Sequence, residues 1–400
     1  MLKSLNVAEL TPKEEVHARI NKLKERMEKQ GIALTIILQN VDLFYFTGTL
    51  QKGVLAVSVD RDPVFFVEKS LARAMEETPL EITPIKKDKD IKDILGSLGM
   101  LGGRCGMELD VLPVLVFERW KNILGYDNAV DVWPLIRDLR LIKSPFEIRQ
   151  IKRSGEIVTR VFEKAKEIIQ EGMREVDIAA MLESEGRMHG HQGFLRMRGL
   201  NQEMMNMYIT HGLSGTVVSG ADVPISGAGT THAIAQGPSV NKVQKGIPLL
   251  IDYGGGYNGY ITDETRAYAI GELKDIYLKG HAVAREIIEE TMEFAKEGVD
   301  GTEVFMKALH RTKHEGLYEY FMGYGEGKVG FIGHGLGLEI NELPVITPRH
   351  KIILQEGMVF AFEPKFIFPG EGSVGIEVDF IVRKNGLERV TDSPIDITYV

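Results

Sequence analysis

The sequence predicts an α/β protein of two domains, in which an N-terminal α/β domain precedes a larger domain of helices and strands (α+β). Its 400 residues exceed the length of one typical domain. Short apolar runs alternate with charged, helix-periodic segments over roughly the first 140 residues, which is an α/β pattern. A long helical segment and glycine-rich strands follow. We therefore expect domains at residues 1–143 and 144–400.

The N-terminal domain is expected to begin with an amphipathic helix over residues 12–30. The apolar runs that fit strands are 33–39, 53–59, 63–68, 81–87 and 104–113. Charged periodic segments between and after them, at 69–77, 89–99 and 114–124, fit helices.

The second domain is expected to begin near Ser144, because Pro145 follows a strand-like stretch and a long helical pattern begins close after it. Periodic segments predict further helices over residues 176–188, 274–297 and 301–314. Strands are expected between and after these helices.

Composition excludes several classes of protein. The net charge of −9 argues against a nucleic-acid surface, which needs a basic stripe. Cys105 is the only cysteine, so no disulfide can form within the chain. We read no signal peptide at the N-terminus and no uncharged apolar run of the ~18 residues that suggest a membrane span. These features predict a cytoplasmic protein with no membrane or nucleic-acid partner.

Five residues of metal-ligand type lie in glycine-rich or strand-like contexts. We call them the ligand cluster: Asp252, Asp263, His334, Glu363 and Glu377. Buried carboxylates are costly unless they are paired or bind metal. The four carboxylates together match the charge of two divalent ions. The pattern therefore predicts a dinuclear metallohydrolase, with Mn, Co, Zn or Fe as the metal.

The first two carboxylates are expected on one β-hairpin whose turn is Asn258-Gly259, a strong hairpin signal. That turn places Asp252 opposite Thr265 and Asp263 opposite Gly254, so both carboxylates share a face. A register shifted by two residues would make the two aspartates directly opposed. Either register allows them to share a metal.

The other two carboxylates are spaced symmetrically about Gly370, in a loop rich in turn residues. A hairpin there would bring Glu363 and Glu377 together on one face, and His334 would supply an imidazole. Two ions about 3.5–4 Å apart would clamp a bridging hydroxide and polarise a scissile carbonyl.

The motifs that carry these residues resemble the pita-bread metallopeptidase superfamily of methionine aminopeptidases, aminopeptidase P, prolidases and creatinase. The matching segments are Asp252 to Arg266, Gly333 to Leu338, Phe360 to Pro364 and Ile376-Glu377. The resemblance covers Lys143 to the C-terminus, and the preceding creatinase-like domain suits the prolidase and aminopeptidase P branch. It implies that Glu363 is also the proton shuttle and that the protein is a homodimer.

The same resemblance implies that His232, in the segment SGAGTTHAIAQG, is a catalytic residue that contacts substrate and stabilises the tetrahedral intermediate. His211 is a weaker candidate. His189 and His191 resemble a metal pair, but their glycine-rich surroundings favour a loop at the pocket rim or a subunit contact.

Three positions depart from the peptidase pattern. Asn341 stands where a second histidine is usual, and it can donate a hydrogen bond to a substrate carbonyl but cannot carry a proton. Val345 and Gly375 stand where arginines are frequent. These losses affect substrate recognition, while the ligand cluster is complete. They argue against a strict prolidase.

The resemblance therefore implies an Xaa-Pro aminopeptidase or dipeptidase, which removes the residue before a proline at the second position of a peptide by means of a metal-bridging hydroxide. One alternative is a non-peptidase member of the superfamily, either a lyase or a C–N hydrolase. Another is a non-catalytic peptide-binding module, although such modules commonly lose metal ligands.

Overall fold

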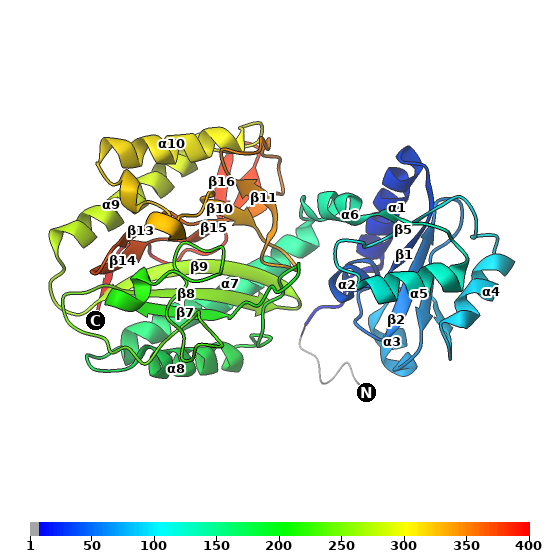
Figure 1. The fold of residues 1–400 in the computed structure, drawn as a ribbon, viewed down its shortest axis with the longest axis horizontal. Coiled ribbons are helices and arrows are strands. Elements are labelled where there is room, and N and C mark those ends of the chain that lie inside the picture. The colour runs from blue at the N-terminus through cyan, green and yellow to red at the C-terminus, as the bar shows by residue number, and fades with distance from the viewer. Residues whose placement is uncertain (1–7) are drawn as a thin grey trace. The chain divides into compact units, whose positions relative to one another are not determined.

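The structure is a computed structural model that describes residues 8–400, and it divides into two compact units (Figure 1). The division falls between Arg140 and Leu141, and the short segment Arg198–Gln202 belongs to the first unit. The second unit comprises Leu141–Met197 and Glu203–Val400. The expected domain boundaries, residues 1–143 and 144–400, remain a prediction.

The first unit is built on a mixed six-stranded sheet with strand order β4-β3-β2-β1-β5-β6. Its strands are β1 (Ile32–Ile37), β2 (Gly53–Ser58), β3 (Val64–Val67), β4 (Ile82–Pro84), β5 (Arg104–Met107) and β6 (Val130–Asp131). Its helices are α1 (Lys13–Lys29), α2 (Asn40–Thr47), α3 (Leu71–Glu77), α4 (Lys89–Ser97), α5 (Val114–Leu124) and α6 (Trp133–Arg140). The predicted alternation of strands and helices is confirmed.

A buried ion-pair network stabilises the first unit. The Asp42 carboxylate is fully buried and accepts hydrogen bonds from Arg140 at 2.9 Å and from Arg198 at 2.8 Å. Arg198 also pairs with Asp110 through two nitrogens, and its guanidinium lies 3.6 Å from the ring centre of Trp133. Because buried carboxylates need such partners, Arg198 contributes to the stability of this unit.

The first helix of the second unit is α7 (Pro145–Ile168), and a capping box marks its start. Ser144 Oγ accepts from the Glu147 amide, and Glu147 Oε2 accepts from the Ser144 amide. The other helices are α8 (Glu175–Met188), α9 (Asp275–Phe294) and α10 (Gly301–His314), with short 3₁₀ turns η2 (Gly212–Thr216), η3 (Tyr318–Tyr320) and η4 (Gly325–Gly327).

Two sheets and a separate hairpin form the inside of this unit. One sheet has the order β17-β9-β8-β7, the other has the order β11-β10-β12-β15-β16, and β13 pairs with β14. The strands are β7 (Met207–His211), β8 (Leu249–Tyr257), β9 (Tyr260–Ala269), β10 (Gly333–Gly335), β11 (Glu342–Ile346), β12 (Val359–Phe362), β13 (Lys365–Phe368), β14 (Gly372–Gly375), β15 (Val378–Arg383), β16 (Gly386–Arg389) and β17 (Thr398–Tyr399).

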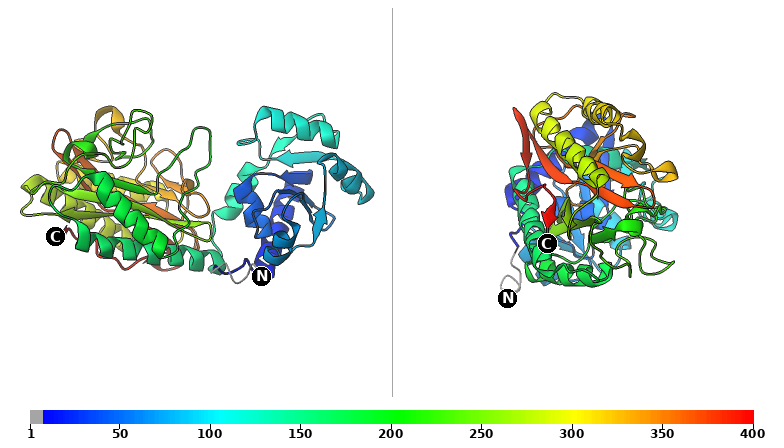
Figure 2. Two further views of the ribbon diagram at one scale, coloured as in Figure 1. Left: turned by 90° about the horizontal axis from the view of Figure 1, so that it is seen from below. Right: turned by 90° about the vertical axis from the view of Figure 1, so that its left-hand side faces the viewer.

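The four helices cover the sheets in two pairs. Apolar residues of α7 and α8 pack with those of β7, β8 and β9 in one core, and those of α9 and α10 pack with the second sheet in another. Figures 1 and 2 show the two helix pairs on opposite sides of the strands. The inner faces of the two sheets are therefore free to present polar side chains between them.

The β8–β9 hairpin has the first predicted register. Asp252 pairs with Thr265 and Asp263 pairs with Gly254, which excludes the register shifted by two residues. Asn258 and Gly259 occupy the turn with φ of 50° and 86°, the left-handed conformation that a tight hairpin turn requires.

The region around Gly370 also forms the predicted hairpin. In β13–β14, Phe368 pairs with Gly372, and in the next stretch Phe362 of β12 pairs with Val378 of β15. Both stretches share one register, so Glu363 and Glu377 face each other in the gap between them. Gly370 has a φ of 75° in the connecting turn, where glycine is favoured.

Candidate active site

The structure brings the ligand cluster together from both sheets. Asp252 and Asp263 project from β8 and β9, His334 from β10, and Glu363 and Glu377 from the two breaks that flank β13 and β14. Asp263, Glu363 and Glu377 are at most 4% exposed, whereas Asp252 and His334 are partly accessible. A molecule in solution can therefore reach the buried carboxylates through the accessible side of the cluster.

Three members of the cluster form a group of the size that holds a cation, which we call the ion group: Asp263, His334 and Glu377. Each offers one ligand atom, and these atoms all lie within 4.8 Å of one another. His334 Nε2 lies 3.7 Å from Asp263 Oδ2 and 3.9 Å from Glu377 Oε1. Distances of this size, longer than a hydrogen bond, leave space for an ion between the atoms.

Asp263 supplies a separate sign that the ion group fits a divalent cation. Its Oδ1 is buried and has no hydrogen-bond partner among residues 8–400, although buried carboxylate oxygens are normally satisfied. Burial, together with the charges of Glu377 and Asp252, raises the pKa of Asp263 well above its ordinary value. A bound cation would satisfy this oxygen and favour the ionised carboxylate.

Lys365 lies among the remaining carboxylates, and the sequence reasoning missed it. Its Nζ donates hydrogen bonds to Asp252 Oδ2 at 2.9 Å, Glu363 Oε2 at 2.9 Å and Glu377 Oε2 at 2.8 Å. The side chain is 3% exposed. Burial alone would lower the pKa of Lys365, but the three carboxylates outweigh burial and raise it. The lysine is therefore a buried ammonium.

Hydrogen bonds from neighbouring residues hold Glu377 and Asp263 in position. Thr265 Oγ1 donates to Glu377 Oε2 at 2.8 Å, and the Arg266 guanidinium donates to the Glu377 backbone carbonyl at 2.6 Å. Asp379 accepts from the Asp263 amide at 2.8 Å. Such outer contacts orient metal ligands, and they follow from the pairing of β9 with the segment at Glu377.

The three other histidines considered from the sequence have structural roles in the structure. His189 pairs with Glu185 at 2.8 Å, whereas His191 Nε2 donates to the Gly254 carbonyl at 3.0 Å, so the two do not form a metal pair. His211 is buried, and its Nε2 accepts from the Gln244 amide at 2.9 Å. Burial lowers the pKa of His211 to about 4.

The two residues predicted to contact substrate are both exposed. His232 lies in a tight turn closed by a 3.1 Å hydrogen bond from the Ile234 amide to the Thr231 carbonyl. Its side chain makes no hydrogen bond or ion pair with any other described residue. Asn341 immediately precedes β11. Their roles remain predictions.

The other departures from the peptidase pattern lie beside the site. Val345 of β11 is the cross-strand partner of His334, so an apolar side chain borders the imidazole. Gly375 is the cross-strand partner of Lys365. The sequence reasoning had identified both positions but not what they adjoin.

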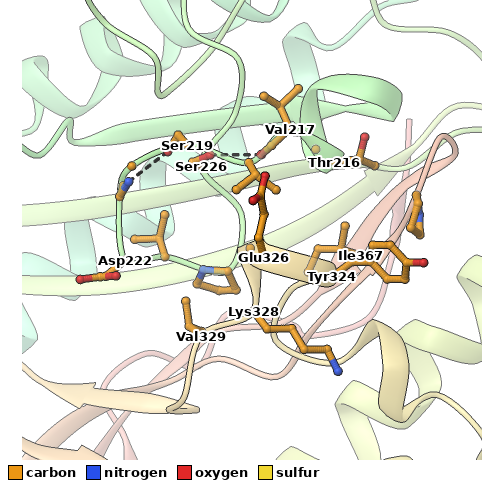
Figure 3. A pocket seen from close by; sticks show the side chains of 18 residues that line it. Thr216, Val217, Ser219, Asp222, Ser226, Tyr324, Glu326, Lys328, Val329 and Ile367 are labelled. Carbon is orange, nitrogen blue, oxygen red and sulfur yellow. Dashed lines mark hydrogen bonds between the residues drawn. The ribbon is translucent and has the colours of Figure 1, made fainter.

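A separate pocket of about 160 Å³ lies in the same unit and is drawn in Figure 3. Residues 215–224 and 326–329 form much of its wall, and Tyr324, Ile367 and Pro369 complete another part. No member of the ligand cluster lines it. The pocket is therefore separate from the ligand cluster.

A helix-covered pair of sheets that gathers carboxylates and an imidazole between its layers is consistent with a metallopeptidase. The chain belongs to metallopeptidase family M24, which it matches over residues 149–384. Residues 19–142 match the creatinase/prolidase N-terminal domain. The expected creatinase-like and pita-bread domains are thus confirmed.

Individual relatives agree with this assignment over nearly the whole chain. The Xaa-Pro dipeptidase of Pyrococcus furiosus is 29% identical over 375 residues, which cover 93% of this chain and 97% of that protein. The Xaa-Pro dipeptidase from Bacillus anthracis superposes with a TM-score of 0.82 at 25% identity, over 96% of this chain and 100% of its own. The X-Pro aminopeptidase from Thermotoga maritima gives 0.78 at 25% identity, over 95% and 99%.

None of the helices within residues 8–400 is long and apolar enough to cross a membrane.

Proposed function

We propose that this chain is a divalent-metal-dependent peptidase that removes the N-terminal residue of a peptide whose second residue is proline. The main support for this proposal is the ion group. Its three ligand atoms lie close together, and one carboxylate oxygen of Asp263 in this group has no hydrogen-bond partner among the described residues. Membership of family M24 and the Xaa-Pro peptidases among the relatives support this substrate class.

Asp263, His334 and Glu377 would hold a divalent ion, which when bound would supply Lewis-acid polarisation of the scissile carbonyl and would lower the pKa of water. Glu363 is the proton shuttle in this proposal. Because Lys365 holds its Oε2, proton transfer falls to Oε1. The carboxylate is thus kept in one orientation beside the reacting centre.

His232 and Asn341 are proposed to donate hydrogen bonds to the substrate carbonyl, and the exposure of both side chains supports this. We expect His232→Ala to lower kcat by ~10²-fold, as loss of one such donor does elsewhere. His350→Ala removes an exposed histidine and is the matched control. An unchanged kcat in His232→Ala would remove His232 from the catalytic residues.

Peptides longer than dipeptides are the proposed substrates. A strict dipeptidase needs a cation for the substrate's free carboxylate. The apolar Val345 borders His334 at the position where arginine is frequent in the prolidases that the chain resembles. Peptides of two to five residues with proline second test this length preference. A higher kcat/KM for the dipeptide would contradict it.

The choice of metal and the assembly state are also part of the proposal. Mn²⁺ or Co²⁺ suits a donor set of carboxylates and one imidazole, and Zn²⁺ and Fe²⁺ are further candidates. The resemblance supports a homodimer, and the single cysteine supports a reducing, cytoplasmic location. The count of carboxylates predicts two ions, and the position of Lys365 bears on that number.

The direct test is hydrolysis of Xaa-Pro peptides by purified protein loaded in turn with each of these four metals. We expect cleavage before proline, loss of activity in Asp263→Ala, and unchanged activity in Glu293→Gln, which alters an exposed carboxylate on α9. Failure to cleave any Xaa-Pro peptide with any of the metals would overturn the proposal.

A further inference from the structure

The position of Lys365 decides which carboxylate oxygens remain for metal. A lysine ammonium has three protons to donate. Here the three carboxylates that accept them are Asp252, Glu363 and Glu377, at 2.8–2.9 Å. The donor capacity of Lys365 is therefore used entirely within the ligand cluster.

The two oxygens of Glu377 serve different cations. Oε2 accepts from Lys365, whereas Oε1 faces His334 Nε2 at 3.9 Å. The ion group therefore has an oxygen of Glu377 that Lys365 does not use, the His334 imidazole at 3.7 Å from Asp263 Oδ2, and the partner-less Oδ1 of the same Asp263 carboxylate. One ion fits there without displacing the lysine.

A second ion held by Asp252 and Glu363 would compete with Lys365, which takes one oxygen of each of these carboxylates. The lysine is anchored there from several directions. Its backbone carbonyl accepts from the Met322 amide at 2.9 Å, and β13 pairs it directly with Gly375. Its side chain lies over Gly375, where a Cβ atom would come within 2.6 Å of Lys365 Cγ.

Charge is compatible with a single ion. One divalent ion and one ammonium leave the four carboxylates with a single residual negative charge. Two divalent ions beside the ammonium would leave these side chains one positive charge in excess, which a bridging hydroxide would neutralise, but they would bring like charges close together with little water to screen them.

We propose that the centre is mononuclear: one divalent ion binds at Asp263, His334 and Glu377, and the Lys365 ammonium occupies the place of a second ion. This inference rests on the metal dependence in the proposed function and is independent of the peptide substrate.

The test is the Mn²⁺ stoichiometry of the metal-free full-length protein, measured by elemental analysis after gel filtration and by electron paramagnetic resonance. We expect one ion per chain with the spectrum of an isolated Mn²⁺. Lys365→Ala frees the oxygens and should bind a second ion, with a spectrum of two coupled ions. Lys274→Ala, which removes an exposed lysine paired with Glu371, should bind one.

Two ions in the wild-type protein, or none, would overturn the inference. A folded Lys365→Ala protein that binds no more than one ion would also overturn it. If Lys365→Ala does not fold, the wild-type stoichiometry and spectrum decide alone. Because these measurements need no substrate, one bound ion without Xaa-Pro cleavage rejects only the proposed function, and cleavage with two bound ions rejects only this inference.

Discussion

Gly375 lies directly opposite Lys365 in the β13–β14 hairpin, and its lack of a side chain makes room for the buried lysine. A Cβ atom at position 375 would lie 2.6 Å from Lys365 Cγ and 2.9 Å from its Cα. Because one of these contacts is with the backbone, the lysine cannot relieve the overlap by rotating its side chain alone. The position of Lys365 therefore depends on a glycine at position 375.

Gly375→Ala should destabilise the protein by roughly 1–3 kcal/mol, the usual cost of forcing an extra methyl group into a packed site. Chemical denaturation of the metal-free protein measures the loss. Gly386→Ala is the control, since nothing lies within 4 Å of a Cβ atom there. Equal stability of the two variants would show that Gly375 is not required for the position of Lys365.

Thr265→Val should weaken metal binding by ~10-fold or more, because loss of a hydrogen bond to a metal ligand typically has this effect. The substitution removes the 2.8 Å bond to Glu377 Oε2 and preserves the shape of the side chain. Calorimetric titration with Mn²⁺ measures the Kd. Thr216→Val, which loses only a bond to the Leu213 carbonyl, should leave the Kd unchanged. An unaltered Kd in Thr265→Val would refute the positioning role.

Arg198→Ala should destabilise the first unit by ~3–5 kcal/mol, because it removes one partner from the buried Asp42 carboxylate. Arg119→Ala breaks an exposed ion pair with Asp88 and should cost at most ~1 kcal/mol. The two tryptophans of the chain, Trp120 and Trp133, both lie in this unit, so their fluorescence during denaturation reports its unfolding. Similar denaturation midpoints for the two variants would show that the buried ion-pair network does not stabilise the first unit.

Stability should fall as pH decreases from about 6.5 towards 4, in part because of His281. Burial lowers the pKa of His281 to about 4, so the folded protein keeps this ring neutral while the unfolded chain takes up a proton. The stabilisation is present above the unfolded pKa and is lost as pH falls through this window. One such group contributes a slope of about 1.4 kcal/mol per pH unit.

His281→Gln tests this contribution, since glutamine retains a donor for the Ile395 carbonyl but does not titrate. The unfolding free energy of the variant should depend less steeply on pH between about 6.5 and 4 than that of the wild type. Parallel curves for the two proteins would show that His281 does not contribute.

Local rules predicted the parts of the site that lie on regular hairpins. The Asn258-Gly259 turn determines the register of β8 and β9, and that register places Asp252 and Asp263 on one face. The turn at Gly370 similarly brings Glu363 opposite Glu377. His334 joins them through pairing of β10 with β12, a long-range contact that no local pattern in the sequence predicted.

Lys365 was missed because the charge count considered only the carboxylates. Alternation along a strand places residues two apart on one face, so a lysine two positions after Glu363 was a detectable signal. The depth of its burial could not be predicted from this alternation, because that depth depends on Gly375 across the hairpin. The exposure of His232 likewise depends on a loop whose path no local pattern determines.

One divalent ion and one lysine ammonium share the ligand cluster in the proposed mononuclear centre. Anomalous diffraction from crystals of the wild-type protein grown with excess Mn²⁺ counts and locates the bound ions. We predict one anomalous peak, bounded by Asp263, His334 and Glu377, with the Lys365 side chain still bonded to Asp252. A second peak between Asp252 and Glu377, with Lys365 displaced, would show that the centre is dinuclear.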